Sequence, residues 1–348
     1  MNTSVIYALA AAALFGASTP LAKLLGTEIP PVLLAGLLYL GSGIGLVLLR
    51  FIRDRGWKKS GLSVSEWPWL GGAIVFGGIL GPVALMLGLT LTSGATASLM
   101  LNLEPVLTAV LAWVVFKENA DRRIVVGMLA IIAGGIVLSW PSGQASSVEQ
   151  SWVGPLAVAF ACLCWAVDNN LTRKVSASDA LFIAGTKGLF AGLVNCAIGL
   201  TLGASIPPLA ALSPTLLIGF LGYGVSLVLF VLALRGLGAA RTGAYFSTAP
   251  FLGAAISIVL LDESVSMLFW VAAAFMMFGV WLHLTEQHEH MHEHQPLQHT
   301  HRHIHDEHHQ HEHAEEVAPG SAHSHAHLHY PVRHNHPHFP DIHHRHRH

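Results

Sequence analysis

Long apolar stretches recur along most of this sequence, and they constrain the fold more than any other feature. Each has about the 17–25 residues that a helix needs to cross a bilayer. Because lipid cannot satisfy open backbone groups, these stretches are predicted to be helices, and the chain an all-α integral membrane protein. We place ten of them, near residues 4–25, 31–52, 67–89, 94–116, 124–140, 152–171, 180–202, 214–234, 240–261 and 266–285.

The composition divides the chain into two unlike parts. Overall it is 53% hydrophobic and 11% charged, whereas a soluble domain carries about 25% charged residues. Of the 24 His, all but His283 lie in residues 286–348. Three Cys are too few for a disulfide scaffold, and no basic patch points to a nucleic-acid partner. No nucleophile–base arrangement or phosphate loop is present, so we expect no enzyme activity.

The basic residues of the apolar part gather in alternate connections. Twelve of the 14 Lys and Arg in residues 1–285 lie in or beside the connections that follow the second, fourth, sixth and eighth stretches. Cytoplasmic loops carry the excess of Lys and Arg, so these connections are predicted to be cytoplasmic. With ten spans, both termini then lie in the cytoplasm, and the protein is expected in the inner (plasma) membrane.

The two halves of the apolar part match at a nearly constant offset. Each half holds five spans, so the second must enter the membrane in the opposite orientation. Inverted repeats place a transporter's substrate near the midplane, between the halves. We therefore expect five-helix domains at 1–142 and 151–285, followed by a tail at 286–348. The matching residues, 145 positions apart, are Pro105 and Pro250, Glu118 and Glu263, and Gly134 and Gly279.

The residues around these matches resemble the EamA branch of the drug/metabolite transporter superfamily. In the first half the resemblance rests on Leu-Asn-Leu-Glu-Pro at 101–105 and Lys-Glu at 117–118. In the second it rests on Ala-Pro at 249–250 and Asp-Glu at 262–263. It covers roughly residues 4–285 and implies ten helices in two five-helix repeats. It also implies carrier-type transport, commonly efflux of small metabolites.

Among the ionisable side chains inside predicted spans, three stand out: Glu104, Asp168 and Lys187. Such groups cost about 2.5–3.5 kcal/mol at bilayer depth and usually face a cavity. Glu104 precedes Pro105, which removes a backbone donor and tends to bend the helix. A bend beside an acid can open a cavity, so Glu104 is predicted to bind a proton or a cationic group. The structural alternative is a salt bridge from Glu104 to Lys187 that only holds helices together.

The other two charged residues also have two interpretations each. Asp168 either lines an entrance to the site or is hydrated at the cytoplasmic interface. Lys187, deeper in its span, either attracts an anionic group of the substrate or extends its amine to the interface. The predicted transport-pathway residues are Glu104, Lys187, Asp168, Asn102, Pro105 and Pro250.

The tail repeats the pattern His-x-His. Neutral imidazole is a preferred ligand of Zn, Ni, Co and Cu, so the tail is predicted to bind divalent transition metals. Its Pro residues and scarcity of large apolar residues predict disorder without metal. No cofactor is required for the fold. The predicted ligands are His288, His290, His292, His294, His299, His301, His303, His305, His323, His325, His327, His329, His334, His336, His338, His344, His346 and His348.

These features favour one function and leave two alternatives. The favoured function is a secondary transporter that exports a small organic metabolite by alternating access, coupled to protons through Glu104. The first alternative is a divalent metal exporter whose tail collects or senses the metal. The second is a membrane-anchored metal buffer or sensor without flux. The expected partners are the lipid bilayer, a small-molecule substrate and metal ions at the tail; the pattern sets no oligomeric state.

Overall fold

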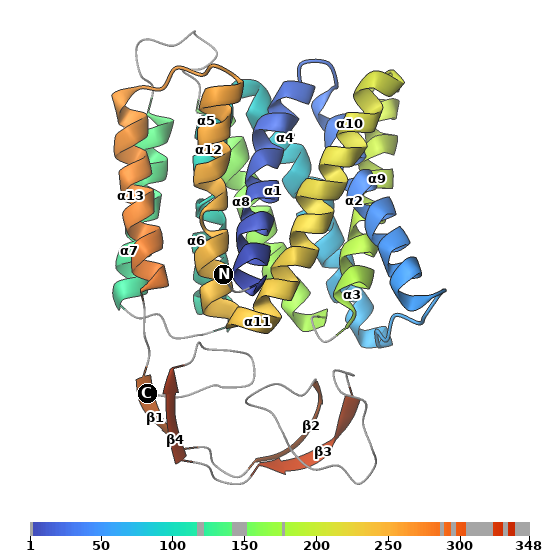
Figure 1. The fold of residues 1–348 in the computed structure, drawn as a ribbon, viewed down its shortest axis with the longest axis vertical. Coiled ribbons are helices and arrows are strands. Elements are labelled where there is room, and N and C mark those ends of the chain that lie inside the picture. The colour runs from blue at the N-terminus through green and yellow to red at the C-terminus, as the bar shows by residue number, and fades with distance from the viewer. Residues whose placement is uncertain are drawn as a thin grey trace.

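The computed structural model describes residues 3–116, 122–140, 152–175, 178–285, 289–293, 297–303, 323–329 and 333–337. Up to residue 285 the described chain is a bundle of helices (Figure 1), as the apolar stretches predict. The α-helices are α1 (Thr3–Leu25), α2 (Pro31–Asp54), α3 (Trp67–Ala73), α4 (Gly81–Leu91), α5 (Gly94–Met100), α6 (Leu103–Phe116), α7 (Arg122–Ser139), α8 (Val153–Thr172), α9 (Ala180–Thr201), α10 (Leu209–Gly219), α11 (Ser226–Phe246), α12 (Ala249–Leu260) and α13 (Met267–Leu284). Shorter helical pieces are η1 (Val64–Glu66), η2 (Ile74–Leu80), η3 (Arg173–Val175) and η4 (Phe220–Val225).

Nine helical segments among the described residues are long and apolar enough to cross a membrane. A tenth apolar helix, α12, has only 12 residues. The start of α1 and the end of α13 lie at the same end of the bundle, the lower end in Figure 1, which we call the near end. The opposite end, where α1 ends and α13 begins, is the far end.

Both halves carry the same local interruptions. The π-helical pieces η2 and η4 lie inside the third and eighth spans, separated by close to the 145-residue offset of the sequence repeat. A turn at residues 101–102 and another at 247–248 are separated in the same way. A π-helical turn and a tight turn each free carbonyl groups from the regular helical pattern, and such turns often mark functional sites. The two halves therefore share their irregularities as well as their helices.

Two of the predicted stretches differ in detail from the helices that form. The stretch predicted as one helix at 94–116 is split into α5 and α6, because Pro105 has no N–H for the carbonyl of Leu101. That carbonyl accepts from the backbone N–H of Glu104 instead (3.1 Å). The predicted connection at 235–239 is helical, since α11 runs unbroken to Phe246. Its glycines weaken a helix by only about 1 kcal/mol each, which a continuous helix tolerates.

The most extensive contact between the halves in the described part of the chain joins α2 to α9, and glycines make it possible. A Cβ atom on Gly43 would lie 2.3 Å from the backbone nitrogen of Leu189, and one on Gly188 would lie 2.7 Å from the Cα of Gly43. Small residues allow helix backbones to approach in lipid, where no hydrophobic force draws helices together. This contact holds the first half of the chain against the second.

Gly43→Ala is expected to destabilise the protein by about 1–3 kcal/mol, the usual cost of overpacking. The new methyl group would meet backbone rather than a movable side chain. The midpoint of thermal unfolding in detergent measures the effect. Gly71→Ala is the matched control, because a Cβ there has nothing within 4 Å. Equal midpoints for the two variants would contradict the close approach of α2 and α9.

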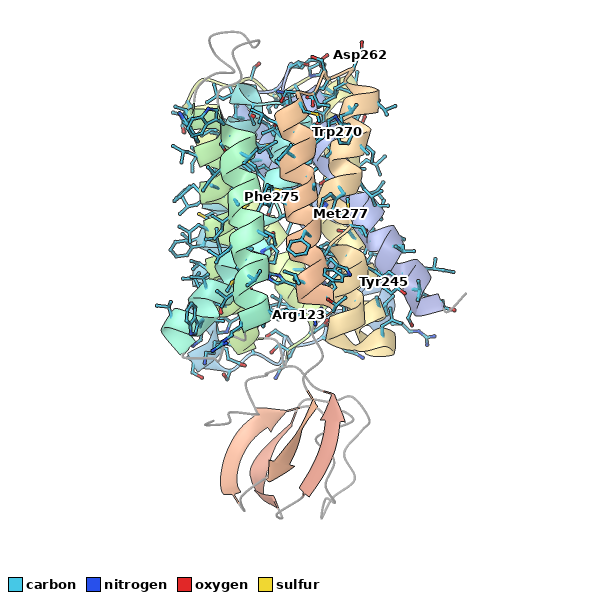
Figure 2. The ribbon with its side chains drawn as sticks, turned by 90° about the vertical axis from the view of Figure 1, so that its left-hand side faces the viewer. Arg123, Tyr245, Asp262, Trp270, Phe275 and Met277 are labelled. Carbon is cyan, nitrogen blue, oxygen red and sulfur yellow. The ribbon has the colours of Figure 1, made fainter. Side chains whose placement is uncertain are left out.

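The outer surface of the bundle is apolar, as a bilayer requires. Along α13, Trp270, Phe275 and Met277 point away from the bundle (Figure 2) and are 56%, 43% and 58% exposed. A soluble protein rarely exposes so continuous an apolar face. The described helices thus fit a lipid surrounding.

The described part of the tail forms two pairs of strands. Strand β1 (Glu289–Glu293) is antiparallel to β4 (Arg333–Pro337), and β2 (Leu297–His303) to β3 (His323–His329). A pair of strands is marginally stable by itself, so the disorder expected without metal stays a prediction. The register sets His290 opposite His336, His292 opposite His334, His299 opposite His327, His301 opposite His325, and His303 opposite His323. The predicted ligands outside the described residues are His288, His294, His305, His338, His344, His346 and His348.

Candidate functional site

Two of the three predicted charged residues form an ion pair inside the bundle. Lys187 on α9 donates from Nζ to Oδ2 of Asp168 on α8 at 2.5 Å. The two side chains are 19% and 6% exposed, and Thr172 donates to Oδ1 of Asp168 at 2.9 Å. In the described part of the chain Lys187 thus pairs with Asp168, and not with Glu104 as the structural alternative has it. The hydrated interfacial position considered for Asp168 does not hold either, because its carboxylate is buried.

Glu104 lies beside this ion pair and joins the two halves. It occupies the first turn of α6, directly after the interruption at 101–102. Its Oε1 accepts from Nδ2 of Asn169 on α8 at 2.9 Å, and the same amide reaches Oγ1 of Thr108 at 3.3 Å. The Glu104 side chain is half-buried. A carboxylate of the first half thus meets an amide of the second.

The π-helical piece η2 supplies carbonyl oxygens to the same region. Gly77 O accepts from the hydroxyl of Tyr39 at 2.8 Å and from Nε1 of Trp165 at 3.0 Å. Gly78 O accepts from Nδ2 of Asn195 at 3.1 Å. In a regular α-helix these oxygens bond within the helix, so the π-helical turn explains why three side chains converge here.

Gly77 also brings the ion pair close to the first half. A Cβ atom on Gly77 would lie 1.9 Å from Oδ2 of Asp168, so only glycine fits this position. We call the assembly around it the polar cluster. Its members come from α2, η2, α6, α8 and α9, and they are Tyr39, Gly77, Glu104, Thr108, Trp165, Asp168, Asn169 and Lys187.

Aromatic rings extend from the polar cluster toward α11. Tyr39 lies 5.6 Å from Tyr223, which lies 6.2 Å from Phe15, between ring centroids. Phe15 lies 5.5 Å from Phe246, the last residue before the turn at 247–248. These four rings form an aromatic row. The row gives the polar cluster an apolar, aromatic neighbour.

The remaining predicted pathway residues lie elsewhere. Asn102 is buried in the interruption and donates to Leu99 O at 2.9 Å, with Sδ of Met276 at 3.9 Å. Pro105 adjoins Glu104 and is exposed, whereas Pro250 begins α12 and is half-buried. The contacts described for Asn102 thus hold the turn rather than extend the cluster.

An ionic contact at the near end joins the two halves. Asp179 caps the start of α9 and accepts from Nε of Arg50 at 3.0 Å and from the guanidinium of Arg53, both on α2. Burial raises the pKa of the Asp179 carboxyl, but the hydrogen bonds from Arg53 and Arg50 outweigh burial and lower that pKa to about 2. The carboxylate therefore stays charged in its contact with α2.

Asp179→Asn is expected to lower the thermal midpoint at neutral pH and to make little difference in acid. An unfolded Asp has a pKa of about 3.9, so a lowered folded pKa adds stability above that pH. The added stability is lost as the pH falls through the folded pKa of about 2. Thermal unfolding of both proteins across a pH series measures the difference, with the exposed Asp262→Asn as control. A pH-independent difference would contradict the stated cause.

Comparison with known proteins agrees with this architecture. The profile of the EamA-like transporter family matches residues 2–140 and again residues 152–285. An uncharacterized transporter of Methanothermobacter thermautotrophicus is 27% identical over 77% of this chain and 82% of its own length. The uncharacterized transporter YyaM of Bacillus subtilis is 25% identical over 63% of this chain and 74% of its own.

A solved structure supports the fold. One crystal structure superimposes on this chain with a TM-score of 0.60 and 20% sequence identity. The match covers 80% of this chain and 95% of the other. The family profile, by contrast, covers nearly all of the helical bundle, once in each half. The chain therefore belongs to the EamA-like transporter family.

Proposed function

We propose that this protein is a secondary transporter that exports a small organic metabolite by alternating access. The observation that carries the proposal is the polar cluster, in which Glu104 of the first half meets Asn169 of the second. Charged groups inside a membrane protein are costly and usually serve a pathway. A carrier with two repeats holds its cargo where the repeats meet, which is where these groups lie.

The proposed orientation follows from the basic residues and the repeat. Five spans in each half make the second half an inverted copy of the first. The excess of Lys and Arg in alternate connections supports a cytoplasmic near end, which carries both termini, and a far end outside the inner membrane. Export runs from the near end, past the polar cluster, to the far end.

The charges of the cluster suggest the chemistry of the cargo. Asp168 and Lys187 neutralise each other at 2.5 Å, which leaves the carboxylate of Glu104 to be balanced. A proton or a cationic group of the cargo would balance it, and the aromatic row beside it offers π-faces that attract cations. The proposed cargo is a small organic molecule with a positively charged group, exchanged for a proton at Glu104.

The composition of the growth medium tests this proposal. Cells expressing the full chain are compared with cells expressing Glu104→Gln at equal membrane levels. Organic solutes outside the cells are measured by mass spectrometry, and cell metal by elemental analysis. We expect one class of organic cations outside cells with the full chain only, and equal cell metal. Higher retained metal in Glu104→Gln, without an organic difference, would instead establish metal export.

A second function is proposed for the tail: binding of divalent transition metal in the cytoplasm. Its support is the register, which sets five His opposite five others in the strand pairs. Bound metal would be collected, sensed or buffered there. Full-length protein in detergent is titrated with Ni²⁺ and Zn²⁺ beside a chain ending at Thr285. Loss of most bound metal in the short chain supports this role, and equal binding refutes it.

A further inference from the structure

The third span and the fourth are joined at the far end of the bundle by a short break between two helices. Helix α4 ends at Leu91 and α5 begins at Gly94, with Thr92 and Ser93 extended between them. A broken helix exposes unbonded carbonyls at the end of one piece and unbonded N–H groups at the start of the next. The first carry partial negative charge and the second partial positive charge.

A cation of the same half occupies the negative side of the break. Lys23, near the end of α1, donates from Nζ to Leu89 O at 2.7 Å and to Thr92 O at 2.6 Å. An ammonium group at the carboxyl end of a helix is favourably placed in the field of that helix. Lys23 thus ties α1 to α4 within the first half.

An anion of the other half occupies the positive side. Oε1 of Glu263 accepts from the backbone N–H of Gly94 at 2.7 Å, and Oε2 accepts from that of Ala95 at 2.8 Å. Charge-assisted hydrogen bonds of this kind are about twice as strong as neutral ones. Ser93 adds a side-chain cap by accepting from the N–H of Thr96 at 3.0 Å. Glu263 therefore crosses from the second half to hold the first.

The backbone before Glu263 fixes this position. Asp262 has φ of 51°, in the left-handed region that side chains other than glycine seldom adopt. Figure 2 shows Asp262 at the far end, in the connection between α12 and α13. Such strained conformations persist only where the surrounding contacts maintain them. The next residue along the chain, Glu263, supplies such contacts through its two hydrogen bonds.

A cavity of about 350 Å³ lies beneath the break. Its lining includes Lys23, Thr27, Met86, Thr90 and Glu263. Sites for small molecules start at about 300 Å³, so the cavity has room for a small metabolite. Met86, on α4, is only 2% exposed. Lys23 and Glu263, which form hydrogen bonds at the break, thus also line the cavity.

In the second half the equivalent connection, between the eighth and ninth spans, is helical instead. By the 145-residue offset, Gly94 and Ala95 correspond to residues 239–240, which lie inside the continuous helix α11. The acid equivalent to Glu263, Glu118, lies outside the described residues. The two halves thus differ at this position, as the halves of an inverted-repeat carrier do when one side is closed.

We propose that Glu263 is a clasp that closes the far end of the carrier. It is a positioning residue that holds α5 of the first half against the second half. Release of its two hydrogen bonds lets the halves separate and exposes the buried inner wall of the 350 Å³ cavity, at Met86, to the far side. This proposal rests on the proposed function, because only a carrier must open and close this end.

Labelling of one introduced cysteine tests the clasp. Met86→Cys is placed in a chain whose native Cys162, Cys164 and Cys196 are replaced by Ala. A charged thiol reagent that does not cross membranes is applied to the far side of sealed vesicles, and the labelling rate is measured. Glu263→Gln should raise that rate at least tenfold, because an amide nitrogen cannot accept from an N–H group. Ser93→Ala should raise it less, and Asp262→Asn should leave it unchanged.

An unchanged labelling rate in Glu263→Gln would overturn the proposal. Size-exclusion profiles confirm that each variant is folded, and Glu263→Asp, whose shorter side chain cannot reach both N–H groups, replaces Glu263→Gln if that variant does not insert. The readout needs no cargo, so it is independent of the export assay. Faster labelling without any exported organic solute would support the clasp and refute the proposed cargo.

Discussion

Lys187→Met is expected to abolish export and to destabilise the protein by about 3–5 kcal/mol. The substitution removes the ammonium 2.5 Å from Asp168 and leaves that carboxylate buried without its cation. Thermal unfolding in detergent measures the loss of stability, and the organic solutes outside cells measure export. Lys174→Met, which removes an exposed basic residue beyond the end of α8, is the matched control.

The double variant Lys187→Met with Asp168→Asn separates stability from transport. With both charges removed, no buried charge is left unpaired, so most of the lost stability should return. If the pair contacts cargo, export should remain absent. Recovery of both stability and export would mean that the ion pair only holds α8 against α9.

Glu104→Gln is expected to remove export with little change in stability. Oε1 of Glu104 accepts from Nδ2 of Asn169 at 2.9 Å, and the amide oxygen of glutamine can accept the same hydrogen bond. Glutamine cannot bind or release a proton, so any residual flux should lose its dependence on pH. Export measured across a pH series checks this, with Glu28→Gln, an exposed acid, as control. Normal flux with normal pH dependence would exclude Glu104 from the pathway.

The apolar stretches predicted the helical bundle well, because length and hydrophobicity decide which segments cross a membrane. The helix boundaries differ from the prediction at two places, one with a proline and one with glycines, because these residue types weaken a helix to different extents. Pro105 removes a hydrogen bond outright and splits its span. Gly236 and Gly238 only lower helix propensity, so α11 passes through them.

The charged members of the polar cluster could be predicted, but not their partners. An ionisable residue in an apolar stretch stands out in any sequence, as Glu104, Asp168 and Lys187 do. Which helices lie side by side depends on packing between distant segments. The pairing of Lys187 with Asp168 rather than Glu104 therefore needs the structure.

The aromatic members of the cluster carried no usable signal. Tyr39 and Trp165 lie in apolar helices, where rings are equally suited to lipid and to packing. Their role depends on the carbonyl of Gly77, which only the π-helical turn makes available. The sole hint in the sequence is the pair of glycines at 77–78 within an apolar stretch.

The most direct test of the account is whether the polar cluster is reached from both sides of the membrane. Thr108→Cys, in the chain without native cysteines, places a thiol beside Glu104 and Asn169. An impermeant thiol reagent is applied to right-side-out and to inside-out vesicles. Labelling from each side is expected, because alternating access opens the cluster first to one face and then to the other. Protection of the thiol from both sides, in protein that is folded and inserted, would show that the cluster is a buried structural contact and would contradict a transport pathway through it.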